Sequence, residues 1–145
     1  MTDVCGRRRD NPDSINNRGD ALRVLIADDD QDTVATLTLL LQDEGYEVQG
    51  VYTGRHVVGA ILDFAPDAVI LDINLPDLSG WEVARRIRER QGPQPLLIGI
   101  SGEYKKGADK VLAHISGFDH YLVKPYDPQM IFSALGELRT GGRLR

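Results

Sequence analysis

The sequence has a single cysteine, no long apolar run and no room for a second domain of ordinary size. Cys5 cannot form an internal disulfide, and about 120 of the 145 residues suffice for a packed core without cross-links or a structural metal. No apolar stretch approaches the roughly 18 residues of a membrane span. No apolar segment follows the arginines of the amino terminus, which excludes a secretory signal. We therefore expect one domain with tails, in a cytoplasmic protein that contacts no membrane.

Basic charge is in short supply as well. The chain has 17 Lys and Arg against 22 Asp and Glu, a net charge of −5. Residues 1–20 are balanced and residues 137–145 carry +2, so residues 21–136 carry −7. Nonspecific nucleic-acid binding relies on Lys and Arg that neutralise phosphates. We therefore expect no nucleic-acid partner, and we expect a monomer or weak dimer.

The order of apolar and polar segments predicts the domain organisation. Residues 1–20 are rich in Asn, Asp, Arg, Gly and Pro, which predicts a flexible leader, and residues 139–145 predict a short basic tail. In between, apolar runs alternate with segments of helical period. The runs predict strands at residues 22–27, 46–51, 68–71, 96–100 and 121–123. This alternation predicts an α/β domain over residues 21–138 with one doubly wound, five-stranded parallel sheet.

The intervening helices have recognisable starts. Asp30, Ser79 and Asp127 stand where an amino-terminal cap is expected, and Gly45 is a natural stop. The weakest helical pattern lies around residues 108–115.

Reactive or ion-binding side chains follow four of the five predicted strands. They are Asp28 and Asp29 after the first, Asp72 after the third, Ser101 after the fourth and Lys124 after the fifth. Ligands of such sheets bind beyond the carboxyl ends of the strands. Three carboxylates held close together need compensation, which Mg²⁺ and the Lys124 ammonium can supply. This set suits phosphoryl transfer to a carboxylate, and Asp72, alone after the central strand, is the best nucleophile candidate.

Simpler interpretations exist for each residue. The three aspartates at 28–30 could serve merely as the start of a helix. Asp72 could be a solvated turn residue, and Lys124 could be a surface residue. One shared site accounts for all of them, which weakens each simpler interpretation. His56, His114 and His120 lack metal-ligand spacing.

Four segments resemble the receiver domain of bacterial response regulators, and the resemblance covers about residues 21–138. The segments are residues 24–30 (VLIADDD), 68–80 (AVILDINLPDLSG), 98–102 (IGISG) and 121–125 (YLVKP). Each is weak alone, but four in the right order at the right strand ends are specific. The resemblance implies a flavodoxin-like fold with strand order 2-1-3-4-5, in a stand-alone protein similar to chemotaxis regulators.

The resemblance also implies a role for each site residue. Asp72 would accept a phosphoryl group from a phosphohistidine, on either a sensor histidine kinase or a histidine phosphotransfer protein. Mg²⁺ would be held by Asp28, Asp29, Asp72 and the backbone carbonyl of Asn74. Ser101 and Lys124 would bind the phosphoryl oxygens. Asn74 and Glu103 would tune the lifetime of the phosphoaspartate.

The expected output of such a domain is a change of shape. Ser101 would move toward the phosphoryl group and Tyr121 would turn inward. A downstream protein would then bind the face made by the helix near residues 108–115, the strand at 121–123 and the last helix, or the phosphoryl group would be relayed onward. The protein would not be an enzyme, although it would assist its own phosphorylation and dephosphorylation. The Lys124-Pro125 peptide would be cis.

Two alternatives stay open at this point. The fold could serve as an unphosphorylated docking domain. It could also be a phosphatase with an Asp nucleophile, similar to the haloacid dehalogenases, but those enzymes need a second Asp two positions on, where this chain has Asn74.

Overall fold

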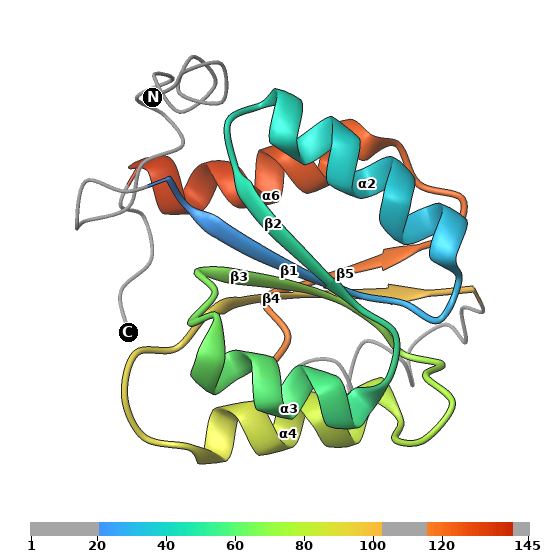
Figure 1. Ribbon diagram of the computed structural model, residues 1–145, viewed down its shortest axis with the longest axis vertical. Coiled ribbons are helices and arrows are strands. Elements are labelled where there is room, and N and C mark those ends of the chain that lie inside the picture. The colour runs from blue at the N-terminus through green and yellow to red at the C-terminus, as the bar shows by residue number, and fades with distance from the viewer. Residues whose placement is uncertain (1–20, 103–115, 141–145) are drawn as a thin grey trace.

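A five-stranded parallel sheet forms the centre of the molecule in the computed structural model, which describes residues 21–102 and 116–140 (Figure 1). In chain order the elements are β1 (Arg23–Ala27), α2 (Gln31–Asp43), β2 (Glu47–Val51), α3 (Gly54–Asp63), β3 (Ala68–Asp72), α4 (Gly80–Glu89), β4 (Leu96–Ser101), β5 (His120–Val123) and α6 (Pro128–Thr140). The strand order β2-β1-β3-β4-β5 confirms the predicted fold. The helix expected near residues 108–115, Glu103 and the leader at 1–20 lie outside the described residues.

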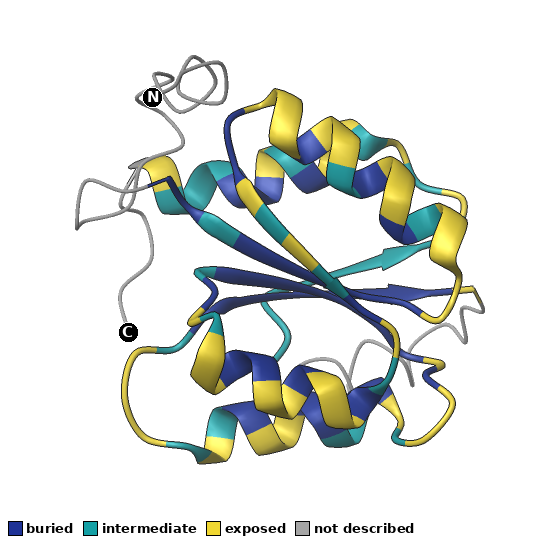
Figure 2. Cartoon of the chain, in the orientation of Figure 1, coloured by how far each residue is buried: buried dark blue, intermediate teal, exposed yellow. Residues whose placement is uncertain are grey.

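The central strands are buried on both faces, as their continuous apolar sequences predict. Every residue of β3 and β4 is buried. Helices α2 and α6 cover one face of the sheet, while α3 and α4 cover the other (Figure 1). Because neighbouring residues of a strand point to opposite faces, Leu97 packs with α3 and α4 whereas Ile98 packs with α2 and α6. Figure 2 shows this layer of buried strands beneath helices whose outer sides are exposed.

The predicted helix starts are confirmed. The side chain of Asp30 accepts hydrogen bonds from the backbone N of Asp32 at 3.1 Å, and that of Ser79 from Glu82 N at 3.2 Å. Asp127 likewise accepts from the backbone N just inside α6, at 3.0 Å. Each cap satisfies a backbone N–H that lacks a partner within the helix.

Strand register brings the carboxyl ends of four strands to one edge. In the sheet, Ala27 lies beside Leu71, Asp72 beside Ile100, and Ser101 beside Val123. The polar residues at the ends of β1, β3, β4 and β5 are therefore neighbours in space. Among the described residues, no helix has both the length and the apolar character that crossing a membrane requires.

Candidate functional site

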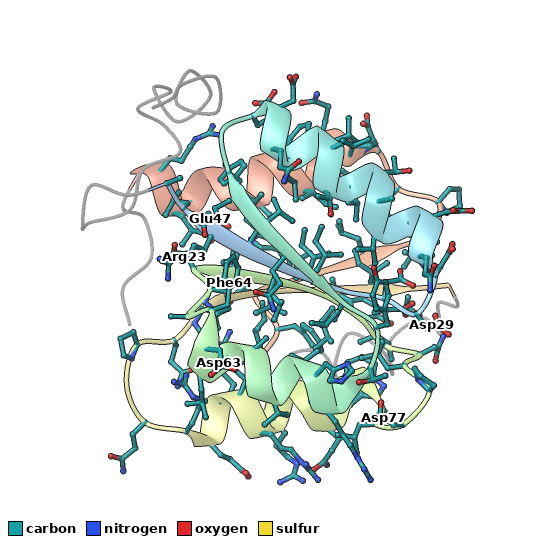
Figure 3. The ribbon with its side chains drawn as sticks, in the orientation of Figure 1. Arg23, Asp29, Glu47, Asp63, Phe64 and Asp77 are labelled. Carbon is teal, nitrogen blue, oxygen red and sulfur yellow. The ribbon has the colours of Figure 1, made fainter. Side chains whose placement is uncertain are left out.

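The residues predicted from the strand ends do meet at one edge of the sheet. Asp28 directly follows β1, and Lys124 directly follows β5. Asp72 and Ser101 are the last residues of β3 and β4 rather than the first beyond them, a shift of one residue from the prediction. Asp28, Asp72 and Ser101 are only 4%, 5% and 4% exposed, whereas Asp29 is exposed. Figure 3 shows Asp29 at this edge and Arg23 at the opposite one.

Backbone hydrogen bonds fix where these side chains start. The N–H of Asp28 donates to the carbonyl of Val51 at 3.2 Å, which ties the end of β1 to the end of β2. The N–H of Lys124 donates to the carbonyl of Ser101 at 2.7 Å, so the end of β5 is held beside the end of β4. The following Lys124-Pro125 peptide is cis, as the family resemblance implied.

Three carboxylates and one ammonium form the centre of the site. Asp28, Asp29 and Asp72 each place a carboxylate oxygen within 4.8 Å of the other two. The Nζ of Lys124 lies 3.5 Å from Asp28 Oδ2 and 3.4 Å from Asp72 Oδ2. The other oxygens of the buried pair accept backbone N–H groups at 2.9 Å, Asp28 Oδ1 from Asp30 and Asp72 Oδ1 from Asn74. Both buried carboxylates are thus oriented from two sides.

The electrostatics of the site reflect this crowding. Burial raises the pKa of the Asp28 carboxyl, and the nearby Asp72 raises it further, although the Asp30 N–H and Lys124 oppose the change. Partial burial alone would lower the pKa of the Lys124 ammonium, but attraction to Asp72 and Asp28 outweighs burial and raises it. Lys124 therefore stays charged, while the ionised form of Asp28 is disfavoured.

This donor set fits a hard divalent cation. Carboxylate oxygens are the ligands that Mg²⁺ prefers, and a site with one or two carboxylates leaves positions for water and phosphate oxygens. The two positive charges of such an ion would offset the repulsion that raises the pKa of Asp28. Asn74, the predicted source of a carbonyl ligand, follows two residues after Asp72 and is tied to it by the N–H contact above.

The aromatic residue with a predicted switching role packs into a small cluster. Tyr121 is half-buried and stacks on Trp81, with ring centroids 5.6 Å apart. Trp81 also meets Phe118 edge-on at 5.7 Å. Gly99 makes room for the cluster, because a Cβ there would lie 3.0 Å from Phe118 and 3.1 Å from Tyr121. The packed position of Tyr121 agrees with the sequence, while its switching stays a prediction.

Sequence reasoning missed the contacts of two residues between the end of β3 and the start of α4. Gly80, the first residue of α4, presses against the end of β3, since a Cβ there would lie 2.6 Å from Ile73 Cα and 2.9 Å from the carbonyl oxygen of Asp72. Asp77 accepts hydrogen bonds from the first residues of α3. Gly80 closes the segment 68–80 that carries the family resemblance, but a glycine after Ser79 also looks like an ordinary helix start. An aspartate after proline looks like an ordinary turn residue, so neither position signals the contact it makes.

Known proteins have sequences similar to this chain. Residues 24–136 match the family model of the response regulator receiver domain. The transcriptional regulatory protein TcrA of Mycobacterium tuberculosis is 34% identical over 127 residues, which cover 86% of this chain and 49% of TcrA. The DNA-binding response regulator MtrA of Mycobacterium leprae is 31% identical over 123 residues, or 85% of this chain and 51% of MtrA.

Solved structures agree with the sequence relatives. A CheY-like receiver domain protein from Methanospirillum hungatei has a TM-score of 0.73 and 28% identity, with 83% of this chain and 94% of that chain covered. The chemotaxis response regulator CheY4 of Vibrio cholerae has a TM-score of 0.73 and 26% identity, with 81% and 98% covered.

The chain spans about half the length of the relatives TcrA and MtrA. Because these relatives are named as transcriptional or DNA-binding regulators, the expectation of no nucleic-acid partner gains no support from them. The family match, the shared fold and the strand-end site all agree, and the chain belongs to the response regulator receiver domains of two-component signalling.

Proposed function

We propose that this receiver domain accepts a phosphoryl group on Asp72 in a Mg²⁺-dependent reaction. The donor would be a phosphohistidine on a sensor histidine kinase or a histidine phosphotransfer protein. The observation that carries the proposal is the environment of Asp72, a buried carboxylate with Lys124 Nζ at 3.4 Å and with carboxylate oxygens of Asp28 and Asp29 within 4.8 Å. Asp28 shares these features. Asp72 differs from it in ending the central strand β3, which pairs with β4, whose last residue is Ser101.

In the proposed reaction an oxygen of Asp72 attacks the phosphorus of the donor. The bond between phosphorus and the donor imidazole nitrogen breaks, its electron pair stays on that nitrogen, and an acyl phosphate forms on Asp72. Mg²⁺ held by Asp28, Asp29 and Asp72, with the Asn74 carbonyl, would offset charge on the phosphoryl oxygens. Lys124, 3.4 Å from Asp72, would pair with one of these oxygens, and Ser101, buried at the end of β4, would donate its hydroxyl to another.

Output through a protein partner is part of the proposal. The surface made by β5 and α6 contains a pocket of about 290 Å³ lined by His120, Leu122, Met130, Ser133 and Ala134. Met130 is 50% exposed there, which gives the surface apolar area for a partner. Amide hydrogen exchange of β5 and α6 should differ between unphosphorylated and phosphorylated protein. Identical exchange in both states would argue against output through this surface.

A mass measurement tests the phosphoacceptor role. The protein is incubated with Mg²⁺ and acetyl phosphate, and intact mass spectrometry is used to look for one added phosphoryl group. Wild type and an Asp63→Asn control, altered at the far end of α3 from the site (Figure 3), should both gain it, whereas Asp72→Asn should not. If wild type gains no phosphoryl group, or if Asp72→Asn gains it equally, the proposal is wrong. Sustained release of phosphate from phosphomonoesters would instead support the phosphatase alternative.

A further inference from the structure

Asp77 joins the loop that follows the phosphoacceptor to a different part of the fold. The loop covers residues 73–79, between the end of β3 and the start of α4. The Oδ1 of Asp77 accepts the backbone N–H of Gly54 at 2.7 Å, and its Oδ2 accepts that of Arg55 at 3.0 Å. These donors are the first two residues of α3, whose N–H groups have no partner within the helix. One carboxylate from the loop therefore satisfies both.

The remaining N–H groups of this helix end are satisfied by Thr53. Its hydroxyl oxygen accepts from His56 N at 3.2 Å, and its carbonyl accepts from Val57 N at 3.3 Å. Thr53 and Asp77 thus divide the capping of α3 between them. They differ in origin, because Thr53 belongs to the chain that enters the helix whereas Asp77 comes from the acceptor loop. This difference allows helix capping to be separated experimentally from loop positioning.

The loop and the helix are also packed too closely for the contact to be incidental. A Cβ on Gly54 would lie 2.8 Å from Leu78 Cβ, 3.1 Å from Val83 Cγ2 and 3.2 Å from Asp77 Oδ1. The first of these distances is shorter than carbon atoms in contact normally allow. Only glycine lets the backbone of α3 come this near. The carboxylate also sits at the positive end of the helix dipole, which favours its charge.

These contacts connect Asp28 to the loop after Asp72 by a second route. The N–H of Asp28 donates to the carbonyl of Val51, the last residue of β2, and Gly54, three residues after Val51, donates its N–H to Asp77. The chain then leads from Asp77 back to Asp72. Asp77 contacts α3 through its two hydrogen bonds and through an ion pair between its Oδ2 and Arg55 Nε at 3.9 Å, in addition to the apolar contacts of Leu75 and Leu78. Figure 3 shows Asp77 at the same edge of the sheet as Asp29.

We infer that Asp77 is a positioning residue for the phosphoacceptor site, because it fixes the loop that carries Asn74 against α3 and so limits where the Asn74 carbonyl can lie relative to Asp28 and Asp29. This inference rests on the proposed function for its meaning, although it concerns metal affinity before any reaction. Partners that orient metal ligands without touching the metal typically change its affinity by about 10- to 100-fold when removed. Because Asp77 acts through the loop backbone, we expect a change of about tenfold, the lower end of this range.

The test compares Asp77→Ala, Asp77→Asn and Thr53→Ala with wild type. Mg²⁺ is titrated while the thermal unfolding midpoint is measured, since a ligand of the folded state raises this midpoint as its concentration exceeds its dissociation constant. Asp77→Ala should need about tenfold more Mg²⁺ for the same rise of the midpoint above its own metal-free value. Asp77→Asn keeps an oxygen that can accept the Gly54 N–H, and should lie closer to wild type than Asp77→Ala does. Thr53→Ala removes a cap from the same helix and should leave the Mg²⁺ requirement unchanged.

Two further readouts separate this inference from the proposed function. Amide exchange in residues 73–79 without Mg²⁺ should accelerate in Asp77→Ala and not in Thr53→Ala. With acetyl phosphate, Asp77→Ala should show a raised Mg²⁺ requirement with a near-normal rate at saturation. Equal Mg²⁺ requirements and equal loop exchange in Asp77→Ala and Thr53→Ala would overturn the positioning role. Absence of phosphorylation in wild type would overturn the proposed function alone. The Mg²⁺ titration and the amide exchange would still test the positioning role of Asp77, because neither measurement depends on phosphorylation.

Discussion

Two glycines in this protein should respond in opposite ways to the same substitution. Gly80 begins α4 and Gly59 lies within α3, and neither has the positive φ that only glycine adopts easily. Backbone strain therefore does not distinguish them, and the space around a new methyl group does. At Gly59 nothing lies within 4 Å of the added Cβ. At Gly80 the Cβ would lie 2.6 Å from Ile73 Cα and 2.9 Å from the carbonyl oxygen of Asp72, and backbone atoms cannot rotate away.

The magnitudes follow from these distances. Carbon atoms in contact lie about 3.5–4.0 Å apart, so Gly80→Ala must displace the acceptor strand or α4 by about 1 Å. Forcing an extra methyl group into a packed site costs about 1–3 kcal/mol. Gly59→Ala should instead stabilise by about 0.5–1 kcal/mol, because alanine loses less conformational entropy in a helix. At about 3–4 °C per kcal/mol, the unfolding midpoints should move in opposite directions by several degrees.

Calorimetry or circular dichroism on wild type and both variants measures these shifts. The phosphorylation rate with acetyl phosphate gives a second readout, since movement of the Asp72 backbone should slow Gly80→Ala and leave Gly59→Ala at the wild-type rate. A Gly80→Ala variant as stable as Gly59→Ala would refute the steric argument. The two variants differ from wild type by the same atoms, so general effects of added apolar surface cancel in the comparison.

Three further substitutions test the charges of the fold. Burial raises the folded-state pKa of the Asp28 carboxyl above its ordinary value of 3.8, so its ionised form is destabilising above that raised pKa. In EDTA, Asp28→Asn should therefore be more stable than wild type near neutral pH by denaturant titration, and the difference should shrink as the pH falls through the raised pKa toward 3.8. In EDTA, Lys124→Ala should lower the free energy of unfolding by about 1 kcal/mol, a modest loss because the ammonium is 36% exposed and partly screened. Saturating Mg²⁺ should recover part of this loss, and equal stability with and without Lys124 would contradict the prediction. Arg88→Met should cost about 3–5 kcal/mol in urea unfolding, because it removes the ion pair of the Asp119 carboxylate, whose side chain is only 11% exposed. Arg86→Met on the exposed face of α4 should change stability little.

Most of the fold could be predicted because its signals are local. The continuous apolar runs of β3 and β4 predict strands covered on both faces, and the caps Asp30, Ser79 and Asp127 each bond to N–H groups within three residues. The strand-end rule then places the site residues at one edge without any knowledge of distances.

The contacts that could not be predicted join residues far apart in the chain. Asp77 reaches back 23 residues to Gly54, and Arg88 reaches forward 31 residues to Asp119. No periodicity encodes such pairs, since each residue type is also an ordinary choice for a turn or an exposed helix. The special role of Gly80 is similarly hidden, because it depends on how closely α4 approaches β3 and not on its neighbours in sequence.

In the proposed function, charge at the site would link metal binding to phosphorylation. Asp28, Asp29 and Asp72 carry three negative charges against one positive charge on Lys124, within a few ångströms. One Mg²⁺ brings this group of charges to neutrality. Phosphorylation replaces the single charge of the Asp72 carboxylate with the nearly double charge of an acyl phosphate, so the phosphorylated site attracts the cation more strongly. Because linkage between two ligands is reciprocal, a site that binds Mg²⁺ more tightly after phosphorylation must also hold the phosphoryl group more favourably with Mg²⁺ bound. The crowded carboxylates, unfavourable for the stability of the metal-free fold, would therefore couple the proposed metal binding to the proposed phosphorylation.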